Sequence, residues 1–412
     1  MPDLGSLLTA GQRIFVAGSS NEPTGLLQHL AGQDLPADLN FIQFPIGGLN
    51  STDFTAWNAS AQFTTFFMTA ALSKADAKRL HFLPMQMRAI YDYLARHVDV
   101  VLLQVAYDRQ GVLRLGPNVD FAAAALGAAR VVIAELNHGF IAPLGCPAID
   151  PAKIDYLFES RRELLPMPAA GIDATAEIIG GLVAGLVQDG DCLQSGIGAI
   201  PAAILQALHG KSDLGMHGGL IDDGGMALIR AGNMTGRRKP VDTGSHITGM
   251  ALGSKALLDW LAETPEVIFC GADHTHEVAA IRRIPNFVSI NSAVEIDLYG
   301  QVNAEFAGGR QISGTGGSVD FMRAAKSSPG GRSIVAMTAT ARGGSASRIV
   351  PKVEMVTALR TDVDIVVTEY GIADLKYLPN RARAEALISI AAPQFRDQLR
   401  SQLADSRQPK QV

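Results

Sequence analysis

One glycine turn in the sequence has the composition of a site for an anion or a polarised oxygen. It reads Gly196-Ile197-Gly198-Ala199-Ile200-Pro201 and precedes an apolar stretch of helical pattern that extends to Leu208. Two glycines on either side of one apolar residue let backbone N–H groups point into a cleft, and the start of the following helix adds partial positive charge. The pattern therefore predicts an anion-binding turn, with an ordinary strand-to-helix turn as the alternative.

Histidines and aspartates near this turn could supply acid–base chemistry. His217, Asp222 and Asp223 lie on either side of Gly219, and His274 and His276 stand together in Asp273-His274-Thr275-His276-Glu277. A histidine that titrates near neutral pH can activate a water molecule for attack on a carbonyl carbon. The His-x-His spacing is also compatible with a metal site, but no further ligand has suitable spacing, so we expect no metal. An exposed loop is the alternative for His274 and His276.

Five strings give the chain a resemblance to a known family. They are Gly196–Pro201, Val288–Gln301, Ser313–Phe321, Gly343–Pro351 and Val366–Leu375. In this order they resemble the acetyl-CoA hydrolase/transferase family, of the 4-hydroxybutyrate CoA-transferase type, and the likeness extends from about Gly11 to Leu399. The resemblance implies an enzyme that takes coenzyme A as substrate or product, binds an acyl-CoA and, for transfer, a carboxylic acid acceptor, and forms a homodimer.

The resemblance also identifies a missing side chain. In the family, Leu-Gly is followed by His-(Ser/Thr)-Glu-Met-Phe-Ser-Asp, whose glutamate attacks the acyl-CoA thioester so that CoA can pass to another acid. Counting from Gly196 without a gap places that glutamate opposite Gly219. Asp223 matches the family aspartate, whereas Asp222 replaces the family serine. The chain is therefore predicted to bind thioesters without the customary nucleophile.

Oxyanion and CoA-binding roles follow from the same resemblance. It places oxyanion donors on the backbone at Ala199 and Ile200 and at Gly316 and Gly317, and it makes Arg342 a candidate cation for the CoA phosphates. The complete predicted set is Gly196, Ile197, Gly198, Ala199, Ile200, Ala293, Gly316, Gly317 and Arg342. A further string, Leu115–Asp120, resembles a family string that would shape the acyl end of the pocket, with a packing turn as the alternative.

Composition excludes several other classes of protein. The chain has 412 residues, is 47% hydrophobic and has a net charge of −5. It has no dense Lys/Arg tract, so nucleic acid is not an expected partner. It has no apolar run of the roughly 20 residues that a membrane helix needs, and its first residues lack a signal-peptide pattern. The three cysteines are widely spaced and suggest no disulfide framework. We expect a cytoplasmic protein.

The elements that would position these residues alternate between strand and helix. Residues 13–17, 98–105 and 130–135 have the pattern of buried parallel strands, and residues 121–129 that of a helix. This alternation predicts an α/β fold with mainly parallel sheets. A similar strand-turn unit near Gly190 agrees with the two tandem CoA-transferase-like domains that the resemblance implies, over residues 1–185 and 186–412. The polar residues 401–412 are expected to form a frayed tail.

Three functions are compatible with these patterns. The first is hydrolysis of an acyl-CoA, at the thioester or at an adjacent C–C bond, by water that a histidine or an aspartate activates. The second is CoA transfer through Asp222 or Asp223, or by direct attack of the acceptor carboxylate. The third is CoA binding without catalysis. We favour hydrolysis, because the glycine loops match the family while position 219 has no side chain.

Overall fold

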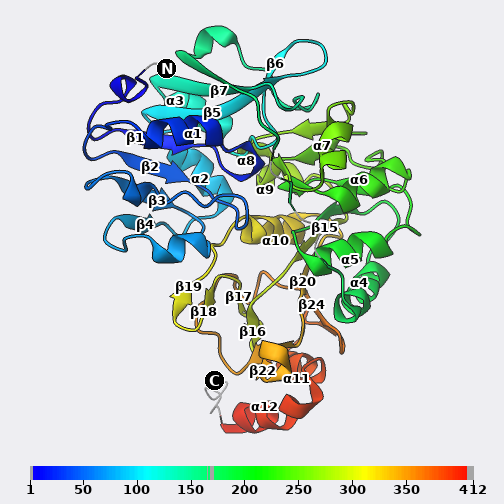
Figure 1. The fold of residues 1–412 in the computed structure, drawn as a ribbon. Coiled ribbons are helices and arrows are strands. Elements are labelled where there is room, and N and C mark those ends of the chain that lie inside the picture. The colour runs from blue at the N-terminus through cyan, green and yellow to red at the C-terminus, as the bar shows by residue number, and fades with distance from the viewer. Residues whose placement is uncertain (1–2, 165, 168–170, 406–412) are drawn as a thin grey trace. The chain divides into compact units, whose positions relative to one another are not determined.

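The computed structural model describes residues 3–164, 166–167 and 171–405, and its chain forms two compact units (Figure 1). Unit 1 consists of Met1–Ala169, His217–Met226 and Gly244–Glu277, and unit 2 consists of Ala170–Met216, Ala227–Thr243 and Val278–Val412. The chain thus returns to unit 1 twice after leaving it. These units do not follow a single division near residue 185, and the division into two tandem family domains stays a prediction.

Unit 1 is built on one large sheet, which confirms the strands predicted at residues 13–17, 98–105 and 130–135. Seven strands run parallel in the order β4 (Leu80–Phe82), β3 (Gln62–Thr65), β2 (Asn40–Gln43), β1 (Arg13–Val16), β5 (Val100–Tyr107), β7 (Val131–Asn137) and β8 (Tyr156–Ser160), and β6 (Leu113–Leu115) pairs antiparallel with β5. The central strand β5 is buried along most of its length, as expected for a strand covered on both faces.

Helices and small strand pairs complete unit 1. The helices are α1 (Thr24–Ala31), α2 (Met87–Leu94), α3 (Ala122–Ala128), α7 (Lys255–Leu261) and α8 (Ala272–Thr275), with α6 (Asp223–Arg230) beginning in this unit. The parallel pairs are β11 (Leu220–Ile221) with β13 (Met250–Ala251), and β12 (His246–Thr248) with β14 (Val267–Phe269). The helix predicted over residues 121–129 is α3.

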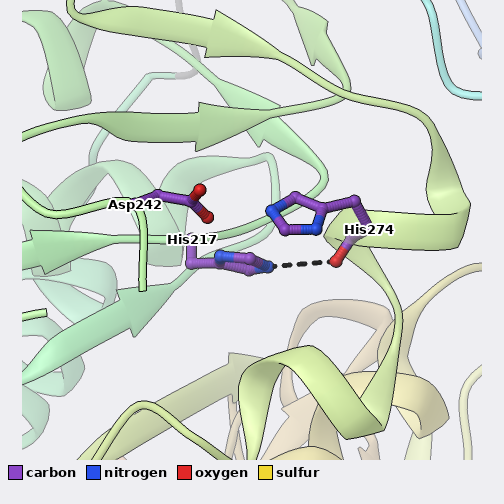
Figure 2. A group of neighbouring side chains, drawn as sticks. All are labelled: His217, Asp242 and His274. Atoms are coloured by element: carbon purple, nitrogen blue, oxygen red, sulfur yellow. Dashed lines mark hydrogen bonds between the residues drawn. The ribbon is translucent and has the colours of Figure 1, made fainter. Parts of the chain in front are cut away.

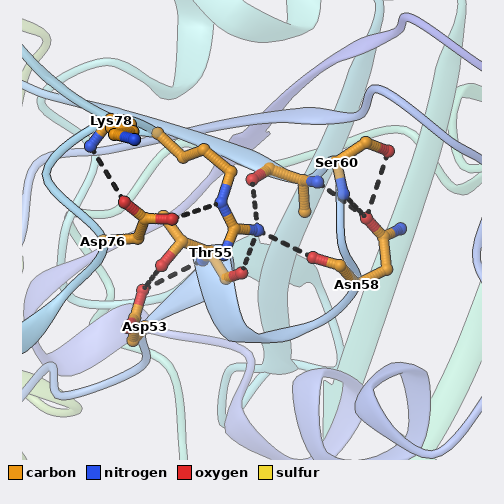
Figure 3. Close-up of polar contacts among 8 residues, drawn as sticks. Asp53, Thr55, Asn58, Ser60, Asp76 and Lys78 are labelled. Carbon is orange, nitrogen blue, oxygen red and sulfur yellow. Dashed lines mark hydrogen bonds and ion pairs between the residues drawn. The ribbon is translucent and has the colours of Figure 1, made fainter.

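Polar contacts fix the loops around β3 (Figure 3). The Arg79 guanidinium donates to the carbonyl oxygens of Thr55 at 2.6 Å and Asn58 at 2.8 Å, and to the Asp76 carboxylate at 2.9 Å. The Asn58 side chain in turn accepts from the Ser60 amide at 2.9 Å. The cluster ties the loop before β3 to the loop after it, so it supports the sheet rather than a site.

Unit 2 has its own sheet of mainly parallel strands, which confirms the predicted α/β class. The order is β10 (Gly215–Met216), β9 (Cys192–Gln194), β15 (Phe287–Asn291), β20 (Arg332–Ala336), β24 (Ile365–Thr368) and β25 (Gly371–Asp374), and only β25 is antiparallel. Shorter strands form β16 (Glu295–Asp297) with β17 (Val302–Asn303) and β23 (Ile349–Val350), β18 (Phe306–Ala307) with β19 (Arg310–Gln311), and β21 (Thr340–Ala341) with β22 (Ala346–Ser347).

The helices of unit 2 pack around this sheet (Figure 1). They are α4 (Ala174–Leu186), α5 (Ala199–Ala207), α9 (Val278–Ile281), α10 (Ser318–Ser327), α11 (Asn380–Ser389) and α12 (Pro393–Asp405). The expectation of a frayed tail from residue 401 is wrong as far as Asp405, because α12 continues to that residue and Leu399 is buried in the core. Residues 406–412 lie outside the described part of the chain. None of the described helices has the length and apolar character of a membrane span.

Candidate functional site

The sheet of unit 2 brings several predicted strings to one edge. The parallel strands β9, β15, β20 and β24 end at Gln194, Asn291, Ala336 and Thr368. The Gly196 turn follows the first of these ends, Ala293 follows the second and Arg342 lies six residues beyond the third. Loops at the carboxyl ends of parallel strands are where open α/β sheets bind ligands. The fold therefore places the Gly196 turn, Ala293 and Arg342 in loops that follow the carboxyl ends of these strands.

The Gly196 turn leads into the start of α5. Gly198 has a φ of 116°, which favours glycine, and it caps α5 without a side-chain hydrogen bond. Ala202 is the first residue of α5 whose amide donates to the Gly198 carbonyl oxygen, at 3.1 Å. The amides of Ala199 and Ile200 therefore lack an intrahelical acceptor, and Pro201 has no amide hydrogen. This is the geometry of a helix N-terminus that can bind an anion.

The second glycine turn has a similar arrangement at the start of α10. Gly316 has a φ of 55°, and Gly317 caps the helix without a side-chain hydrogen bond. The Phe321 amide donates to the Gly317 oxygen at 3.1 Å, and the Ser318 hydroxyl donates to the Thr315 oxygen at 2.9 Å. The amides in the first turn of α10 precede this first helical bond, so they are oriented as donors without a helical partner.

Arginines differ in how firmly the fold holds them. Arg342 is exposed, and its φ of 51° begins a short turn in which Gly343 and Gly344 also have positive φ. Arg348, which sequence reasoning did not single out, is half-buried, and this burial lowers the pKa of its guanidinium while the charge of Glu369 opposes that shift. Glu369 itself accepts a hydrogen bond from the Ala339 amide at 2.8 Å. Arg348 and Glu369 lie inside two of the strings that resemble the family, Gly343–Pro351 and Val366–Leu375. Their place in these strings was the sequence signal that could have identified them.

Gly219 lies in unit 1, where its carbonyl oxygen is hydrogen-bonded. The residue is buried, and its carbonyl oxygen accepts from the amides of Gly249 at 3.1 Å and Met250 at 3.0 Å. The next residues form β11, which pairs with β13 in parallel register. The structure therefore holds position 219 firmly in place without a side chain. That this position corresponds to the family glutamate stays a prediction.

The two aspartates after Gly219 are engaged in helix capping. Asp222 accepts from the Gly225 amide at 2.9 Å, as an N-cap side chain does at the start of α6, and burial raises its pKa. Asp223 accepts from the Ser254 amide at 2.9 Å and from the Ser254 hydroxyl. Each carboxylate thus supports a helix start. An attack by either one on a thioester would break these contacts.

His217 and His274 are neighbours in unit 1 (Figure 2). The Nε2 atom of buried His217 lies 3.3 Å from the His274 carbonyl oxygen, and the two ring centroids are 5.4 Å apart. A carbonyl oxygen only accepts, so Nε2 is the donor in this contact. His217 thereby fixes the backbone of α8 at the point where the half-buried His274 side chain emerges.

His276 is fully packed into unit 1 and differs from the exposed loop considered above. Burial, and then the nearby His217, lower its pKa to about 3. Its Nδ1 lies 2.8 Å from the Thr275 hydroxyl, which donates to the Gly271 oxygen at 3.2 Å. The Thr275 hydroxyl thus lies between the imidazole ring and the Gly271 carbonyl oxygen. A group with so low a pKa is a weak base at neutral pH.

Asp120 is a buried acid that sequence reasoning placed only in a pocket-shaping string. Burial raises its pKa to about 8, so the carboxyl group is neutral at pH 7. It lines a cavity of about 20 Å³, enough for one water molecule, together with Gly18, Phe44, Phe121 and Met250. A Cβ on Gly249 would lie 1.8 Å from Asp120 Oδ1 and 3.2 Å from the Gly219 oxygen. The Asp120 carboxyl group thus packs against Gly249, close to the carbonyl oxygen of Gly219.

Comparison with known proteins agrees with the resemblance. Residues 253–403 match the family described as the acetyl-CoA hydrolase/transferase C-terminal domain. The 4-hydroxybutyrate coenzyme A transferase of Clostridium kluyveri is 42% identical over 306 residues, which are 73% of this chain and 71% of that protein.

Solved structures extend the likeness over nearly the whole chain. The crystal structure of RipA from Yersinia pestis has a TM-score of 0.91 at 30% identity and covers 98% of this chain and 96% of its own. The 4-hydroxybutyrate CoA-transferase of Porphyromonas gingivalis has a TM-score of 0.78 at 30% identity, with 96% and 94% covered.

Proposed function

Because the chain belongs to the acetyl-CoA hydrolase/transferase family, we propose that it hydrolyses an acyl-CoA by attack of water instead of forming a covalent CoA intermediate. The observation that carries this proposal is Gly219, a buried position with a hydrogen-bonded carbonyl oxygen and no side chain that could attack a carbonyl carbon. Helix starts at Ala199 and Ser318 supply amides of the kind that stabilise an oxyanion.

We assign the role of general base to His274. Asp222 and Asp223 are engaged at helix starts, and His276 has a pKa of about 3. His274 is half-buried, so solvent reaches it, and the contact from His217 holds its backbone. In the proposed step, the imidazole takes a proton from water, the water oxygen bonds to the acyl carbon, and the C–S bond breaks. The imidazolium then returns the proton to the CoA thiolate, which leaves a free acid and free CoA.

Thiol release tests this reaction directly. The protein is incubated with acetyl-CoA and with longer and cyclic acyl-CoAs, and free thiol is followed with and without added carboxylates. We expect release without an acceptor, and we expect His274→Gln to lower kcat by about 10²–10⁴-fold, the usual contribution of a general base. His209→Gln, at an exposed histidine of unit 2, is the matched control and should leave the rate unchanged. Full activity of His274→Gln would exclude the assigned base.

CoA transfer is the second candidate, because the relative from Clostridium kluyveri is named a transferase. A Gly219→Glu variant tests whether the chain retains the rest of the machinery for CoA transfer. If the remaining transferase machinery is intact, the new carboxylate should give acceptor-dependent exchange of CoA between acids, while Gly219→Gln, of similar size and without charge, should not. Acceptor-dependent exchange by the unaltered protein, with no release of thiol to water, would favour transfer over hydrolysis.

A further inference from the structure

A pocket of unit 2 lies at the opposite edge of its sheet from the glycine turns. It has a volume of about 530 Å³ and is lined by residues that precede β20 and β24, follow β25 and begin α11. Because β25 is antiparallel to β24, its end returns to the edge where β24 starts. Strands such as the five-residue β20 put roughly 15 Å between this edge and the carboxyl ends. The pocket is therefore separate from the predicted CoA-binding turns.

Positive charge dominates the pocket. Its lining contains the cations Lys326, Arg360, Lys376 and Arg383 against the single carboxylate of Asp364. That carboxylate is already occupied, because it accepts from Lys326 Nζ at 2.7 Å and from the Ser333 amide at 3.2 Å. Within the described ranges, Arg360, Lys376 and Arg383 form no ion pair with a carboxylate. The excess is local, since the whole chain has a net charge of −5.

Arg383 is held in place as a fixed cation. Its guanidinium donates to the carbonyl oxygens of Leu375 at 2.9 Å and Arg360 at 2.7 Å, and more weakly to that of Tyr299 at 3.3 Å. Gly300 makes room for it, because a Cβ there would lie 2.6 Å from Nη2. Burial, and then the charge of Arg360, lower the pKa of Arg383. Two guanidinium groups that line one pocket and form no ion pair in the described part of the chain are a favourable place for an anion.

Two further features of the pocket indicate which class of ligand it would bind. The helix α11 begins at Asn380, which lines the pocket, with neither a side-chain cap nor an acidic residue in its first turn. Its free amides therefore add to the attraction for an anion. Tyr377, also in the lining, is 92% exposed and has a φ of 61°, a backbone conformation that is costly for a bulky residue. Lys376 Nζ lies 5.4 Å from the centroid of its ring.

We propose that this pocket binds a nucleoside phosphate, with the phosphates against Arg360, Lys376 and Arg383 and the base stacked on Tyr377. Cations and helix amides suit phosphate oxygens, and an exposed aromatic ring suits the flat face of a base. The volume lies in the range of small-molecule sites. A free nucleotide such as ADP and the nucleotide end of coenzyme A share this chemistry, so the test must distinguish these two sources.

Calorimetric titration of the full chain tests the site with ADP and with inorganic tripolyphosphate. Both should bind, and Arg360→Glu with Lys376→Glu should weaken both by about tenfold or more, because charge-assisted contacts are lost. Lys74→Glu, at an exposed lysine of unit 1, is the matched control and should change neither. Tyr377→Ala should weaken ADP but not tripolyphosphate, since only ADP has a base to stack.

The source of the nucleotide follows from repeating the ADP titration with coenzyme A at saturation. If ADP still gives the binding heat that Arg360→Glu with Lys376→Glu removes, the site takes a free nucleotide. If coenzyme A abolishes that heat, the site takes the nucleotide end of coenzyme A. The proposal is overturned if neither ADP nor tripolyphosphate binds the unaltered protein, or if the charge-reversed variant binds both with unchanged affinity while its thermal unfolding matches that of the unaltered protein.

Discussion

Asp120, Asp222 and Asp223 are three acids of unit 1 in different electrostatic settings. Asp222 and Asp223 accept hydrogen bonds at the starts of α6 and α7, and burial raises the pKa of Asp222. Asp120 has burial as the cause of its raised pKa and is neutral at pH 7. A neutral carboxyl group can donate a hydrogen bond, whereas a carboxylate only accepts. Asp120 beside Gly249 is thus suited to a polar partner in the small cavity, not to nucleophilic attack.

The titration of Asp120 predicts a specific pH dependence of stability. The folded chain keeps the proton up to a pKa of about 8, whereas the unfolded chain loses it near the ordinary value of 3.8. The stabilising contribution of the proton is therefore complete below about pH 3.8 and is lost as the pH rises towards 8. Asp120→Asn keeps a neutral group and removes this dependence. Relative to the variant, the unaltered protein should lose at most about 1.4 kcal/mol of unfolding free energy per pH unit.

Urea unfolding of both proteins between pH 5 and pH 8 measures that difference. Asp34→Asn, at an exposed aspartate, is the control and should run parallel to the unaltered protein. If the free energy of unfolding of Asp120→Asn also runs parallel to that of the unaltered protein across this pH range, Asp120 is ionised in the folded chain. Asp120 could then not act as a neutral hydrogen-bond donor.

Sequence reasoning predicted local backbone geometry better than the surroundings of buried side chains. The Gly196 turn was predicted as a helix start with free amides, and the structure has this geometry because glycine spacing constrains φ locally. The lowered pKa of His276 and the raised pKa of Asp120 come from burial by residues distant in the sequence, such as Gly249 beside Asp120. No local pattern encodes that burial. The capping contact between Asp223 and Ser254 likewise joins residues that only the fold brings together.

At the scale of elements, the packing of α4 against α5 positions the Gly196 turn. Gly180 in α4 faces α5 so closely that a Cβ there would lie 2.8 Å from the carbonyl carbon and oxygen of Ala203. The turn that presents Ala199 and Ile200 is the start of α5. A displacement of α5 would therefore move the candidate oxyanion donors as well as disturb the core.

Three glycines in α4 give a prediction with internal controls. Gly180→Ala should lower the free energy of unfolding by about 1–3 kcal/mol, because the added methyl group has no space. Gly181→Ala and Gly185→Ala meet nothing within 4 Å and should raise it by about 0.5–1 kcal/mol through helix propensity. Urea unfolding of the three variants measures these changes. The same sign for all three would contradict close contact between α4 and α5 at Gly180.

The order of elements was predictable where hydrophobic periodicity was strong, and less so elsewhere. Strands such as β1 and β5 and the helix α3 were found from their apolar patterns. The two returns of the chain to unit 1, over residues 217–226 and 244–277, were not expected. They depend on pairings such as β11 with β13, whose strands are two residues long and leave no periodic signal.

At the scale of the whole molecule, the chain has the fold of its family, and we propose that Gly219 stands where the family has its attacking glutamate. Unit 2 has two helix starts suited to binding an oxyanion, and unit 1 has Gly219 with histidines and a neutral acid nearby. A covalent route needs a carboxylate that attacks the thioester and then holds CoA. Hydrolysis by water needs only a base and the oxyanion donors.

The mass of the intact protein after reaction with acyl-CoA tests this account most directly. During turnover, a transferase of the covalent type accumulates an enzyme–CoA thioester on its carboxylate, which raises the protein mass by that of CoA less one water. We predict an unchanged protein mass while free thiol accumulates in the same sample. A protein fraction heavier by one CoA, on Asp222, Asp223 or any other carboxylate, would contradict the account.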